Sequence, residues 1–440
     1  MSLDLFPYFL AWRKRYGPFD GSFFLDSFRA GGGARYSYFP LSPPEKIISA
    51  SSPEDFPERW ESLKKETARL SPPAGGPGGP PFTGGAAGVI SYDAGRSFEE
   101  GWRTEPPPDP LRFPLLRFGI YRDLACLDHR EDRFHFFARD ADRMKILRKR
   151  FEDLEPASPG TDPSRRKPAS ASLYKNRAWY LGSVKEIKGY ISRGDIYQAN
   201  LSQRFELPYK ESGLELYSRL RDINPSPYAC YFNLGRFEIA SCSPELLIKV
   251  RGGMASTRPI AGTRPRGNGA AEDRRLEGRL LLSPKERAEH VMLLDLERND
   301  LGRVCRAGTV KVTEKMAVEK YSHVMHIVSQ VEGRLRKDRD VFDAIRAVFP
   351  GGTITGCPKV RCMEILDGIE PVARGPFFGA AGWLGGQGEA ELNLLIRTGL
   401  IRKGRLILQA GSGIVADSNP GKEYDESLHK AEALLSARLG

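Results

Sequence analysis

Two pairs of glutamates are the side chains in this sequence with the clearest capacity for chemistry. Glu286 and Glu289 form the first pair, and Glu423 and Glu426 form the second. Residues three apart share one face of a helix, so two such helices across a cleft would present up to four carboxylates. An all-oxygen site of this kind suits Mg²⁺, which keeps several of its waters. Either pair taken alone is equally consistent with a solvated helix face.

The stretch from Pro259 to Gly267 (PIAGTRPRG) is the second candidate. Its prolines remove backbone donors and its glycine lets a ligand approach the chain closely, so we predict neither an ordinary strand nor a helix here. The amides of Gly262 and Thr263, with arginines alongside, suit an anionic ligand. A basic surface turn is the alternative.

Two further glycine-containing loops precede predicted helices. Phe349 to Pro358 (FPGGTITGCP) contains Thr355 and would place small residues and hydroxyls at a helix N-terminus, where anions bind. A simple connecting loop is the alternative. Gly411, Ser412 and Gly413 form the second loop, before the last helix. Neither a dinucleotide fingerprint nor a P-loop motif is present, so ATP and NAD are not indicated.

Three titratable or charged residues stand in settings that need an explanation. Arg397 lies in an apolar segment (LLIRT), where it serves either a salt bridge or a ligand carboxylate. His326 lies in another apolar stretch and is either a satisfied core residue or an acid–base group. Glu245 follows Ser243-Pro244 and by itself reads as a turn residue.

The elements that must position these residues show no regular alternation of strand and helix, which favours an α+β fold. Helices are predicted over 139–154, 174–192, 283–298, 341–349 and 358–369 and from about 419 onward, and strands over 88–93, 116–127, 133–138, 197–205, 228–233, 236–241, 246–250, 377–384, 391–401 and 405–410. Ser283, Pro284 and Glu286 read as a capping box that starts the 283–298 helix. A Pro- and Ser-rich linker at 156–172 separates an N-terminal region, 1–155, from a catalytic region, 173–440.

Composition excludes several other classes of protein. The net charge of +11 is scattered, and the densest basic cluster, Arg143 to Arg150, is interrupted by apolar residues, so we expect no nucleic-acid partner. No apolar run approaches the roughly 20 residues that span a bilayer, so we expect no membrane insertion. The six cysteines form no CxxC pair, which indicates reduced thiols and a cytoplasmic location.

In their order along the chain, these motifs closely resemble those of the chorismate-utilising enzymes, which include component I of anthranilate synthase and of aminodeoxychorismate synthase. The resemblance is dense from Tyr174 to Leu439. It rests on the segments 194–200 (GDIYQAN), 243–245 (SPE), 259–267, 288–290 (AEH), 295–300 (DLERND), 350–363 and 411–426. The resemblance implies an α/β sandwich of two large, mostly antiparallel sheets with outer helices. It would also make the 156–172 segment a loop within one body.

The resemblance also implies roles for particular residues. Glu289 and Glu426 would bind Mg²⁺ directly, Glu286 and Glu423 would bind it through water, and Lys430 would help neutralise the acidic site. The ion would hold the ring carboxylate of chorismate. Arg397 and the amides of Gly411, Ser412 and Gly413 would bind the enolpyruvyl carboxylate, with Gly262, Thr263 and Thr355 lining the pocket. His326 would be the general acid and Glu245 a general acid or base.

Within the family, several segments favour aminodeoxychorismate synthase, which serves para-aminobenzoate and folate biosynthesis. Gln198 stands where isochorismate and salicylate synthases carry a water-activating lysine, which argues against water as the nucleophile. The segments 24–27 (FLDS), 92–96 (YDAGR), 197–205 with Asn200, and 391–393 (ELN) are more similar to aminodeoxychorismate synthase than to anthranilate synthase. At 24–27, anthranilate synthases carry part of their tryptophan feedback site.

Two residues depart from the pattern. Ala261 stands where well-known aminodeoxychorismate synthases have a lysine proposed to add to the ring, so that covalent route is closed here and anthranilate synthase remains the alternative. Trp383 replaces a usual pocket tyrosine and would lose its hydroxyl contact to the ligand. None of the six cysteines has the setting of a glutaminase nucleophile, so we expect ammonia from a separate glutamine amidotransferase subunit.

Overall fold

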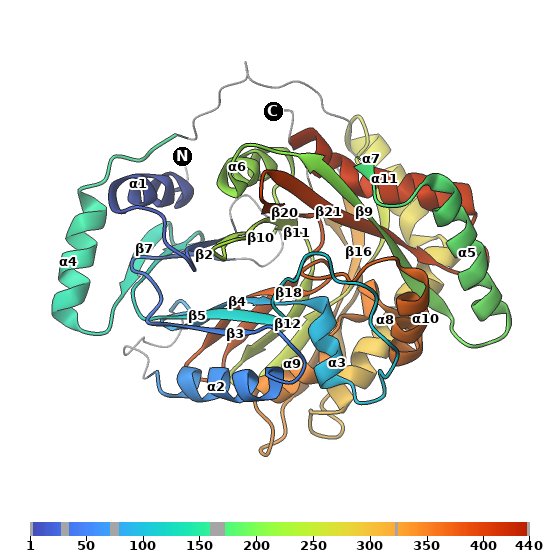
Figure 1. The fold of residues 1–440 in the computed structure, drawn as a ribbon, viewed down its shortest axis with the longest axis horizontal. Helices are drawn as coiled ribbons and strands as arrows, with labels where there is room; N and C mark the ends of the chain where they lie inside the picture. Colours follow the sequence, from blue (N-terminus) through green and yellow to red (C-terminus); the bar gives the residue numbers. More distant parts are fainter. Residues whose placement is uncertain (1–2, 28–34, 71–78, 159–171, 322–323, 438–440) are drawn as a thin grey trace.

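Two large antiparallel sheets face each other, with helices on their outer sides (Figure 1). The computed structural model describes residues 3–27, 35–70, 79–158, 172–321 and 324–437. The main apolar core lies between the sheets, and a second one lies under the helices that cover the outer face of the first sheet. The predicted α+β sandwich is therefore confirmed. No helix in the described ranges is long and apolar enough to cross a membrane.

The first sheet has 11 strands and the second has 10, and every neighbouring pair is antiparallel. In order, the first contains β17 (Gly356–Cys357), β9 (Gln198–Pro208), β21 (Arg405–Ile414), β20 (Thr398–Arg402), β11 (Glu238–Ser243), β10 (Tyr228–Asn233), β1 (Phe23–Asp26), β2 (Tyr36–Pro40), β6 (Leu124–Asp128) and β7 (Arg133–Phe137), with β8 (Ser172–Leu173) beside β9. The second contains β14 (Ile260–Pro265), β16 (Val324–Arg334), β13 (Met254–Arg258), β12 (Leu246–Arg251), β19 (Ala390–Leu394), β18 (Ala380–Gly385), β4 (Gly85–Ile90), β5 (Leu116–Tyr121) and β3 (Lys46–Ala50), with β15 (Lys311–Lys320) beside β16.

Both halves of the chain contribute to both sheets. β1 pairs with β10 in the first sheet, and β4 pairs with β18 in the second. The predicted boundary at 156–172 therefore does not separate the two sheets. This agrees with the single body that the family resemblance implies. Most of that segment, 159–171, lies outside the described residues.

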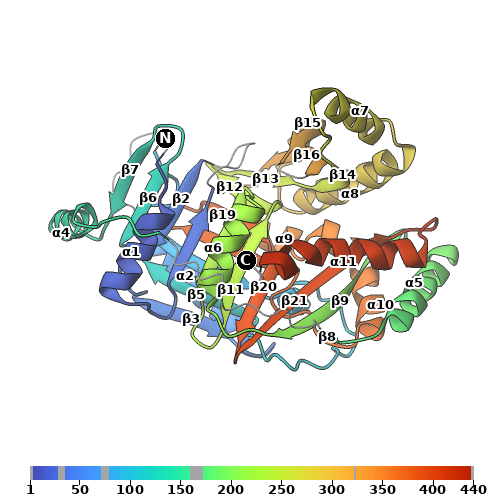
Figure 2. The ribbon, with the colours of Figure 1, turned by 90° about the horizontal axis from the view of Figure 1, so that it is seen from above.

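The helices lie mainly on the outer faces of the two sheets (Figures 1 and 2). They are α1 (Phe6–Tyr16), α2 (Phe56–Ala68), α3 (Gly95–Phe98), α4 (Ala141–Glu152), α5 (Arg177–Ser192), α6 (Gly213–Ile223), α7 (Ala270–Leu281), α8 (Pro284–Gly302), α9 (Val341–Val348), α10 (Lys359–Ile369) and α11 (Pro420–Ala437), with 3-10 turns η1 (Tyr92–Ala94) and η3 (Gly352–Ile354). α11 runs along β21, and α8 lies against β14 and β16. These two helices carry the glutamate pairs.

Only half of the predicted capping box at α8 forms. The Ser283 hydroxyl accepts a hydrogen bond from the amide of Glu286, as expected for an N-cap. The Glu286 carboxylate does not return to the Ser283 amide and instead accepts a bond from Arg264 at 3.1 Å. The motif therefore starts the helix while leaving Glu286 available to the site.

Four predicted loops or strands differ from the structure. The single strand expected over 116–127 is two strands in different sheets, β5 and β6. The Pro259–Gly267 stretch contains strand β14, whose register with β16 shifts between Ala261 and Thr263 because Gly262 adopts φ 71°. Gly411, Ser412 and Gly413 belong to β21 and do not form a loop. The single strand expected over 391–401 is two strands in different sheets, β19 and β20, with Arg397 between them at φ 50°.

Candidate active site

The two acidic pairs meet near one lysine of α11. Lys430 Nζ lies 2.8 Å from Glu426 Oε1 and donates to the carbonyl of Gly411 at 3.0 Å. Burial raises the pKa of Glu289, and the charges of Glu286 and Glu426 raise it further, while Lys430 opposes them. Negative charge from both helices therefore converges on Glu289.

The acidic side chains differ in how they are held. The amide of Gln198 donates to Glu289 Oε1 at 2.9 Å, and the Ser418 hydroxyl donates to Glu423 Oε1 at 2.7 Å. Glu423 is buried, whereas half of the Glu426 side chain is exposed. A carboxylate has two oxygens, and each can accept more than one hydrogen bond. Each of these side chains can therefore still contact a metal ion or a water molecule.

The four glutamates of α8 and α11 do not form a compact cluster within the described structure. In the described residues, the one compact group of three metal-ligating side chains is Asp128, Glu131 and His135, and Arg35 already pairs with both of its carboxylates. The glutamates of α8 and α11 are more widely spaced. Spacing of this kind fits an ion that some carboxylates reach through water.

His326 and Arg397 form a second group of site residues. An Arg397 guanidinium nitrogen lies 3.4 Å from His326 Nε2, and His326 Nδ1 lies 3.0 Å from the Thr263 hydroxyl and 3.3 Å from the carbonyl of Gly262. Since the guanidinium can only donate, Nε2 accepts, and the ring proton is on Nδ1. Burial, then the nearby Arg397 charge, lowers the pKa of His326 to about 3, so the ring is neutral.

Arg397 has no carboxylate partner within the described part of the chain. Burial lowers the pKa of its guanidinium. This guanidinium lies close to the acidic pairs by way of β14: His326 contacts both Arg397 and the carbonyl of Gly262, and a Cβ at Gly262 would lie 2.8 Å from Glu286 Oε2. The charge of Lys430 acts on Glu289, on His326 and on Glu245. An unpaired cation and a cluster of carboxylates therefore belong to one site.

Glu245 is a buried carboxyl beside this group. It is 5% exposed, and burial raises its pKa to about 7. Its Oε1 lies 3.4 Å from the amide of Ile260, at the start of β14. A carboxyl with a pKa near neutrality can either give or take a proton during turnover.

The other expected pocket residues are Thr355 and the Gly411–Gly413 segment, and each has its own contacts within the protein. The Thr355 hydroxyl donates to the carbonyl of Gly351 at 2.9 Å, so it shapes its own loop. Ser412 exchanges a hydrogen bond with Tyr180 at 2.9 Å. β21 pairs with β20 only from Arg405 to Leu408, so β20 leaves that edge unpaired at Gly411 and Gly413, where Lys430 approaches. The prediction of backbone donors at this place is consistent with that free edge.

Trp383 does not lie where we expected it. Its ring stacks on Phe82 with centroids 5.1 Å apart, and it lines a small pocket between the sheets together with Ser27 and Tyr228. None of the acidic side chains, His326 or Arg397 lines that pocket. The presence of Trp383 in place of the family's usual tyrosine therefore does not directly affect the acidic site.

Two arginines of the Pro259–Gly267 stretch have carboxylate partners in the protein. Arg264 pairs with Glu286, and Arg266, just after β14, pairs with Asp273. An anion at the amides of Gly262 and Thr263 stays a prediction, in which these two side chains would be shared with the protein. In the sequence Gln198 is informative only as the absence of a lysine, yet in the structure its amide donates to Glu289.

Comparison with known proteins identifies this arrangement. Residues 23–436 match the family model described as chorismate binding enzyme. The chain belongs to this family. It is 44% identical over 367 residues to the anthranilate synthase component I-like protein of Synechocystis, covering 82% of this chain and 74% of that protein. It is 43% identical over 366 residues to aminodeoxychorismate synthase component 1 of Bacillus subtilis, covering 81% and 77%.

A solved chorismate-binding structure has the same fold. Anthranilate synthase component I from Streptococcus pneumoniae TIGR4 superposes with a TM-score of 0.80 at 30% identity, covering 93% of this chain and 94% of that one. The expected family and architecture are therefore confirmed. The relatives carry the names of two different synthases, so the family match leaves the product undecided.

Substitution of Gly262 by alanine should destabilise the fold and disturb Glu286. A Cβ at this position would lie 2.8 Å from Glu286 Oε2, and the φ of 71° disfavours any side chain. We expect a loss of about 1–2 kcal/mol from backbone strain plus a further loss from the displaced carboxylate. Gly252, at φ 53° with nothing within 4 Å of its Cβ, is the matched control. Equal losses in urea unfolding for the two variants would contradict the contact with Glu286.

Proposed function

We propose that this chain is the synthase subunit that converts chorismate and ammonia to 4-amino-4-deoxychorismate, for para-aminobenzoate and folate biosynthesis. The observation that supports it best is that one site contains two features able to bind a carboxylate: an arginine, and a group of glutamates that could hold a metal ion. Arg397 has no carboxylate partner in the described structure, and the glutamates of α8 and α11 offer a place for a cation. A dicarboxylate such as chorismate matches both features at once.

The glutamate set fits Mg²⁺ as a cofactor. All of its donors are carboxylate oxygens, the negative charges of Glu286 and Glu426 act on Glu289, and Glu289 forms no ion pair within the described residues. Glu289 and Glu426 would hold the ion directly, with Glu286 and Glu423 acting through water. When bound, the ion would hold the ring carboxylate and draw electron density from the ring.

Arg397 would bind the second carboxylate, with help from the backbone amides of Gly411 to Gly413. This contact also prepares His326. A bound carboxylate would offset the charge of Arg397, which is one of the causes that lower the pKa of His326. Substrate binding would therefore make the imidazole a better proton carrier at the moment it is needed.

The proton transfers balance with two residues. The new C–N bond forms as ammonia attacks the ring, and the C–O bond to the 4-hydroxyl breaks. His326, once the bound carboxylate has offset the charge of Arg397 and the ring has taken up a proton on Nε2, gives that proton to the departing hydroxyl, which leaves as water. Glu245 takes the surplus proton from the attached nitrogen, and its pKa of about 7 suits that role. Ala261 offers no nucleophile, so the ring is attacked by ammonia without a lysine adduct.

The choice of product rests on sequence details. Similarity to aminodeoxychorismate synthase component 1 of Bacillus subtilis at 43% identity supports 4-amino-4-deoxychorismate, as do Asn200 and the segment 391–393. Ala261 favours the alternative, anthranilate, which serves tryptophan biosynthesis. The similarity to anthranilate synthase component 1 of Pseudomonas aeruginosa, 42% over 381 residues, also favours it.

Ammonia would be supplied by a glutamine amidotransferase subunit. A glutaminase needs an accessible cysteine thiolate with a histidine partner. Five of the six cysteines here are buried, and Cys357 is partly buried with its pKa raised by burial. The described structure therefore offers no candidate nucleophile, and free ammonia should replace the partner in vitro.

Purified protein should consume chorismate only when ammonium and Mg²⁺ are both present. Loss of absorbance of chorismate would be followed at saturating ammonium, with EDTA and then excess Mg²⁺ added to the same sample. Restoration by Mg²⁺ supports the proposal. Turnover that persists in EDTA, or that proceeds without ammonium, would contradict it.

The pH dependence should carry the signature of Glu245. Because its pKa is about 7 in the folded protein, kcat/KM should fall below neutral pH as the carboxylate takes up a proton and can no longer act as a base. Glu245→Gln should reduce kcat by about 100-fold and remove this acidic limb.

The same substitution should make the fold more stable although it lowers activity. A carboxyl with a raised folded pKa costs stability above its unfolded pKa, so the glutamine variant should gain stability relative to wild type as pH rises toward 7.

A further inference from the structure

A second buried carboxyl group, that of Glu297, lies across a turn of the chain from the proposed base Glu245. Glu297 is on α8 and is 6% exposed. A Cβ at Gly352, the first residue of η3, would lie 3.5 Å from Glu297 Oε1. On the other side of the turn, a Cβ at Gly351 would lie 3.4 Å from Leu247, two residues after Glu245. The turn is therefore packed between the two elements that carry these carboxyl groups.

Glu297 forms no ion pair within the described residues. The buried lysine near it is Lys359 of α10, whose Nζ lies 2.6 Å from Asp300 Oδ2 and donates to the carbonyl of Val348 at 3.1 Å. Both members of the Lys359–Asp300 pair are buried. The lysine is therefore committed to the carboxylate three residues further along α8, and Glu297 is left without a cation.

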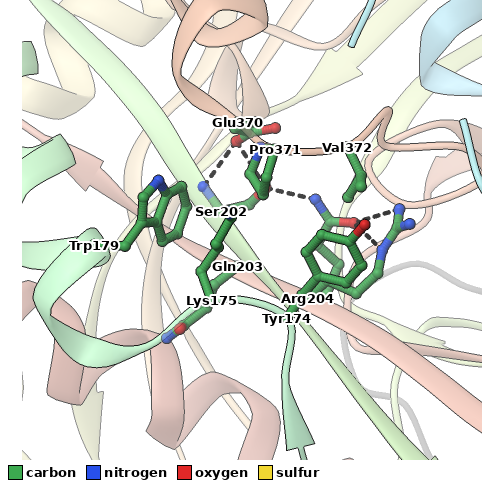
Figure 3. A pocket seen from close by; sticks show the side chains of 10 residues that line it. Tyr174, Lys175, Trp179, Ser202, Gln203, Arg204, Glu370, Pro371 and Val372 are labelled. Atoms are coloured by element: carbon green, nitrogen blue, oxygen red, sulfur yellow. Dashed lines mark hydrogen bonds between the residues drawn. The ribbon is translucent and has the colours of Figure 1, made fainter. Parts of the chain in front are cut away.

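Glu370 shows how an ionised carboxylate is stabilised elsewhere in the interior of this fold (Figure 3). The hydroxyl of Ser202 donates to it at 2.8 Å, the amide of the same residue donates at 2.9 Å, and Arg374 pairs with it at 2.7 Å. A buried charge needs donors of this kind, because the protein interior solvates it poorly. Glu297 has no such set among the described residues, which favours its neutral, protonated form.

The surroundings of Glu297 act in the same direction. Burial, followed by the charge of Asp300, raises the pKa of Glu297 to about 8. Lys359 of α10 and the Thr257 hydroxyl of β13 oppose the rise, and the charge of Glu245 adds to it. At neutral pH the side chain therefore carries a proton and can donate a hydrogen bond.

Glu245 ionises at a lower pH than Glu297. Burial raises its pKa to about 7, and the Thr353 hydroxyl and the charges of Lys430 and Arg397 limit the rise. Between the two pKa values, Glu245 is an acceptor while Glu297 is still a donor. Neighbouring carboxyl groups often share a proton in this way, since two negative charges in one buried place repel each other.

Two hydroxyl groups lie beside these carboxyl groups, that of Thr257 near Glu297 and that of Thr353 near Glu245. Both hydroxyl oxygens are buried and have no hydrogen-bond partner in the part of the chain that the structure describes. A hydroxyl donates one hydrogen bond and accepts others, and buried hydroxyls normally meet a protein group or an ordered water. These two are therefore available to complete a hydrogen-bonded connection between the acids.

We propose that Glu297 is a positioning residue for Glu245: it stays protonated and donates a hydrogen bond, by way of the Thr353 hydroxyl or a water molecule, that orients the Glu245 carboxylate for proton transfer. This inference rests on the proposed function, because it assigns a partner to the base of that reaction. When Glu297 ionises, the donor is lost and the two carboxylates repel each other, so the base is no longer held.

The kcat of Glu297→Gln relative to wild type, followed from neutral to alkaline pH, tests this role. The amide keeps the shape and the donor but cannot ionise. The ratio should therefore be about 1 at pH 7 and rise to about tenfold at pH 9, where about nine-tenths of Glu297 in the wild type would be ionised. Both proteins meet the same free ammonia at each pH, so the ratio isolates Glu297. A ratio that stays constant would overturn the proposal.

Glu297→Leu removes the donor at every pH. Its kcat at neutral pH should fall about tenfold, the equivalent of one hydrogen bond, with KM for chorismate unchanged. In a Glu245→Gln background the same substitution should cause no further loss, because the base that it positions is already absent. An independent tenfold loss in the double variant would contradict a role through Glu245. If the leucine variant folds poorly, the glutamine ratio decides.

Asp93→Asn is the matched control. Burial also raises the pKa of Asp93, to about 6, but its carboxylate accepts from the amide of Gly375 at 2.7 Å and belongs to η1. Its kcat relative to wild type should stay constant from neutral to alkaline pH, and a rise equal to that of Glu297→Gln would overturn the proposal. Wild-type protein that leaves chorismate unchanged with ammonium and Mg²⁺ would refute the proposed function and this inference together, whereas turnover with a constant Glu297→Gln ratio would refute this inference alone.

Discussion

Replacing Glu426 with glutamine is expected to reduce Mg²⁺-dependent turnover of chorismate by about 1000-fold or more, because a direct carboxylate ligand contributes several kcal/mol to a transition state that depends on the ion. The substitution keeps the shape of the side chain and removes its charge. Half of the Glu426 side chain is exposed, so the free energy of unfolding should change by no more than about 0.5 kcal/mol. Turnover at saturating Mg²⁺ and urea unfolding measure the two effects separately.

Glu432→Gln provides the control for this substitution. Glu432 is an exposed residue of the same helix, α11, so it undergoes the same chemical change outside the site. It should keep wild-type turnover and Mg²⁺ affinity. If Glu426→Gln also kept wild-type turnover, Glu426 would not be a metal ligand.

Replacing Arg397 with methionine should separate activity from stability. The variant loses the guanidinium that would bind one substrate carboxylate, so KM for chorismate should rise about 100-fold. The free energy of unfolding should hold or increase by about 1 kcal/mol, because a partly buried cation without a carboxylate partner is removed. Chorismate kinetics and urea unfolding at neutral pH check both expectations.

Arg374→Met is the contrasting case. Arg374 is buried and pairs with Glu370 at 2.7 Å, so its loss leaves a buried carboxylate without its partner. We expect a destabilisation of about 3–5 kcal/mol. If Arg397→Met were destabilised to the same extent, Arg397 would be a structural residue with a partner, and its proposed role in substrate binding would fail.

The acidic pairs and the fold class were readable from the sequence because they depend on local rules. A spacing of three residues on a helix and an N-cap serine before a proline give the same result in almost any context. α8 begins where Ser283 and Pro284 predict, and the charge of Glu426 on α11 raises the pKa of Glu289 on α8. The metal site itself stays a prediction. The family resemblance supplied the sandwich architecture, which no local rule contains.

Other features depend on pairing between distant segments and were not readable. The glycines at 411 and 413 read as a loop, but ten consecutive pairings with β9 hold them in a strand. The Pro259–Gly267 stretch contains a strand for the same reason, since pairing with β16 overrides its prolines and a bulge at Gly262 absorbs the misfit. Trp383 was misplaced because its environment is set by Phe82, about 300 residues earlier in the chain.

Identification of the product tests the proposed function most directly. Chorismate, Mg²⁺ and ammonium would be incubated with the protein, and anthranilate fluorescence and released pyruvate would be measured over time. Aminodeoxychorismate retains the enolpyruvyl group, so we expect chorismate to disappear with neither signal, and both para-aminobenzoate and pyruvate to appear once an aminodeoxychorismate lyase is added. Anthranilate fluorescence and pyruvate release without the lyase would contradict the proposal and establish the anthranilate alternative.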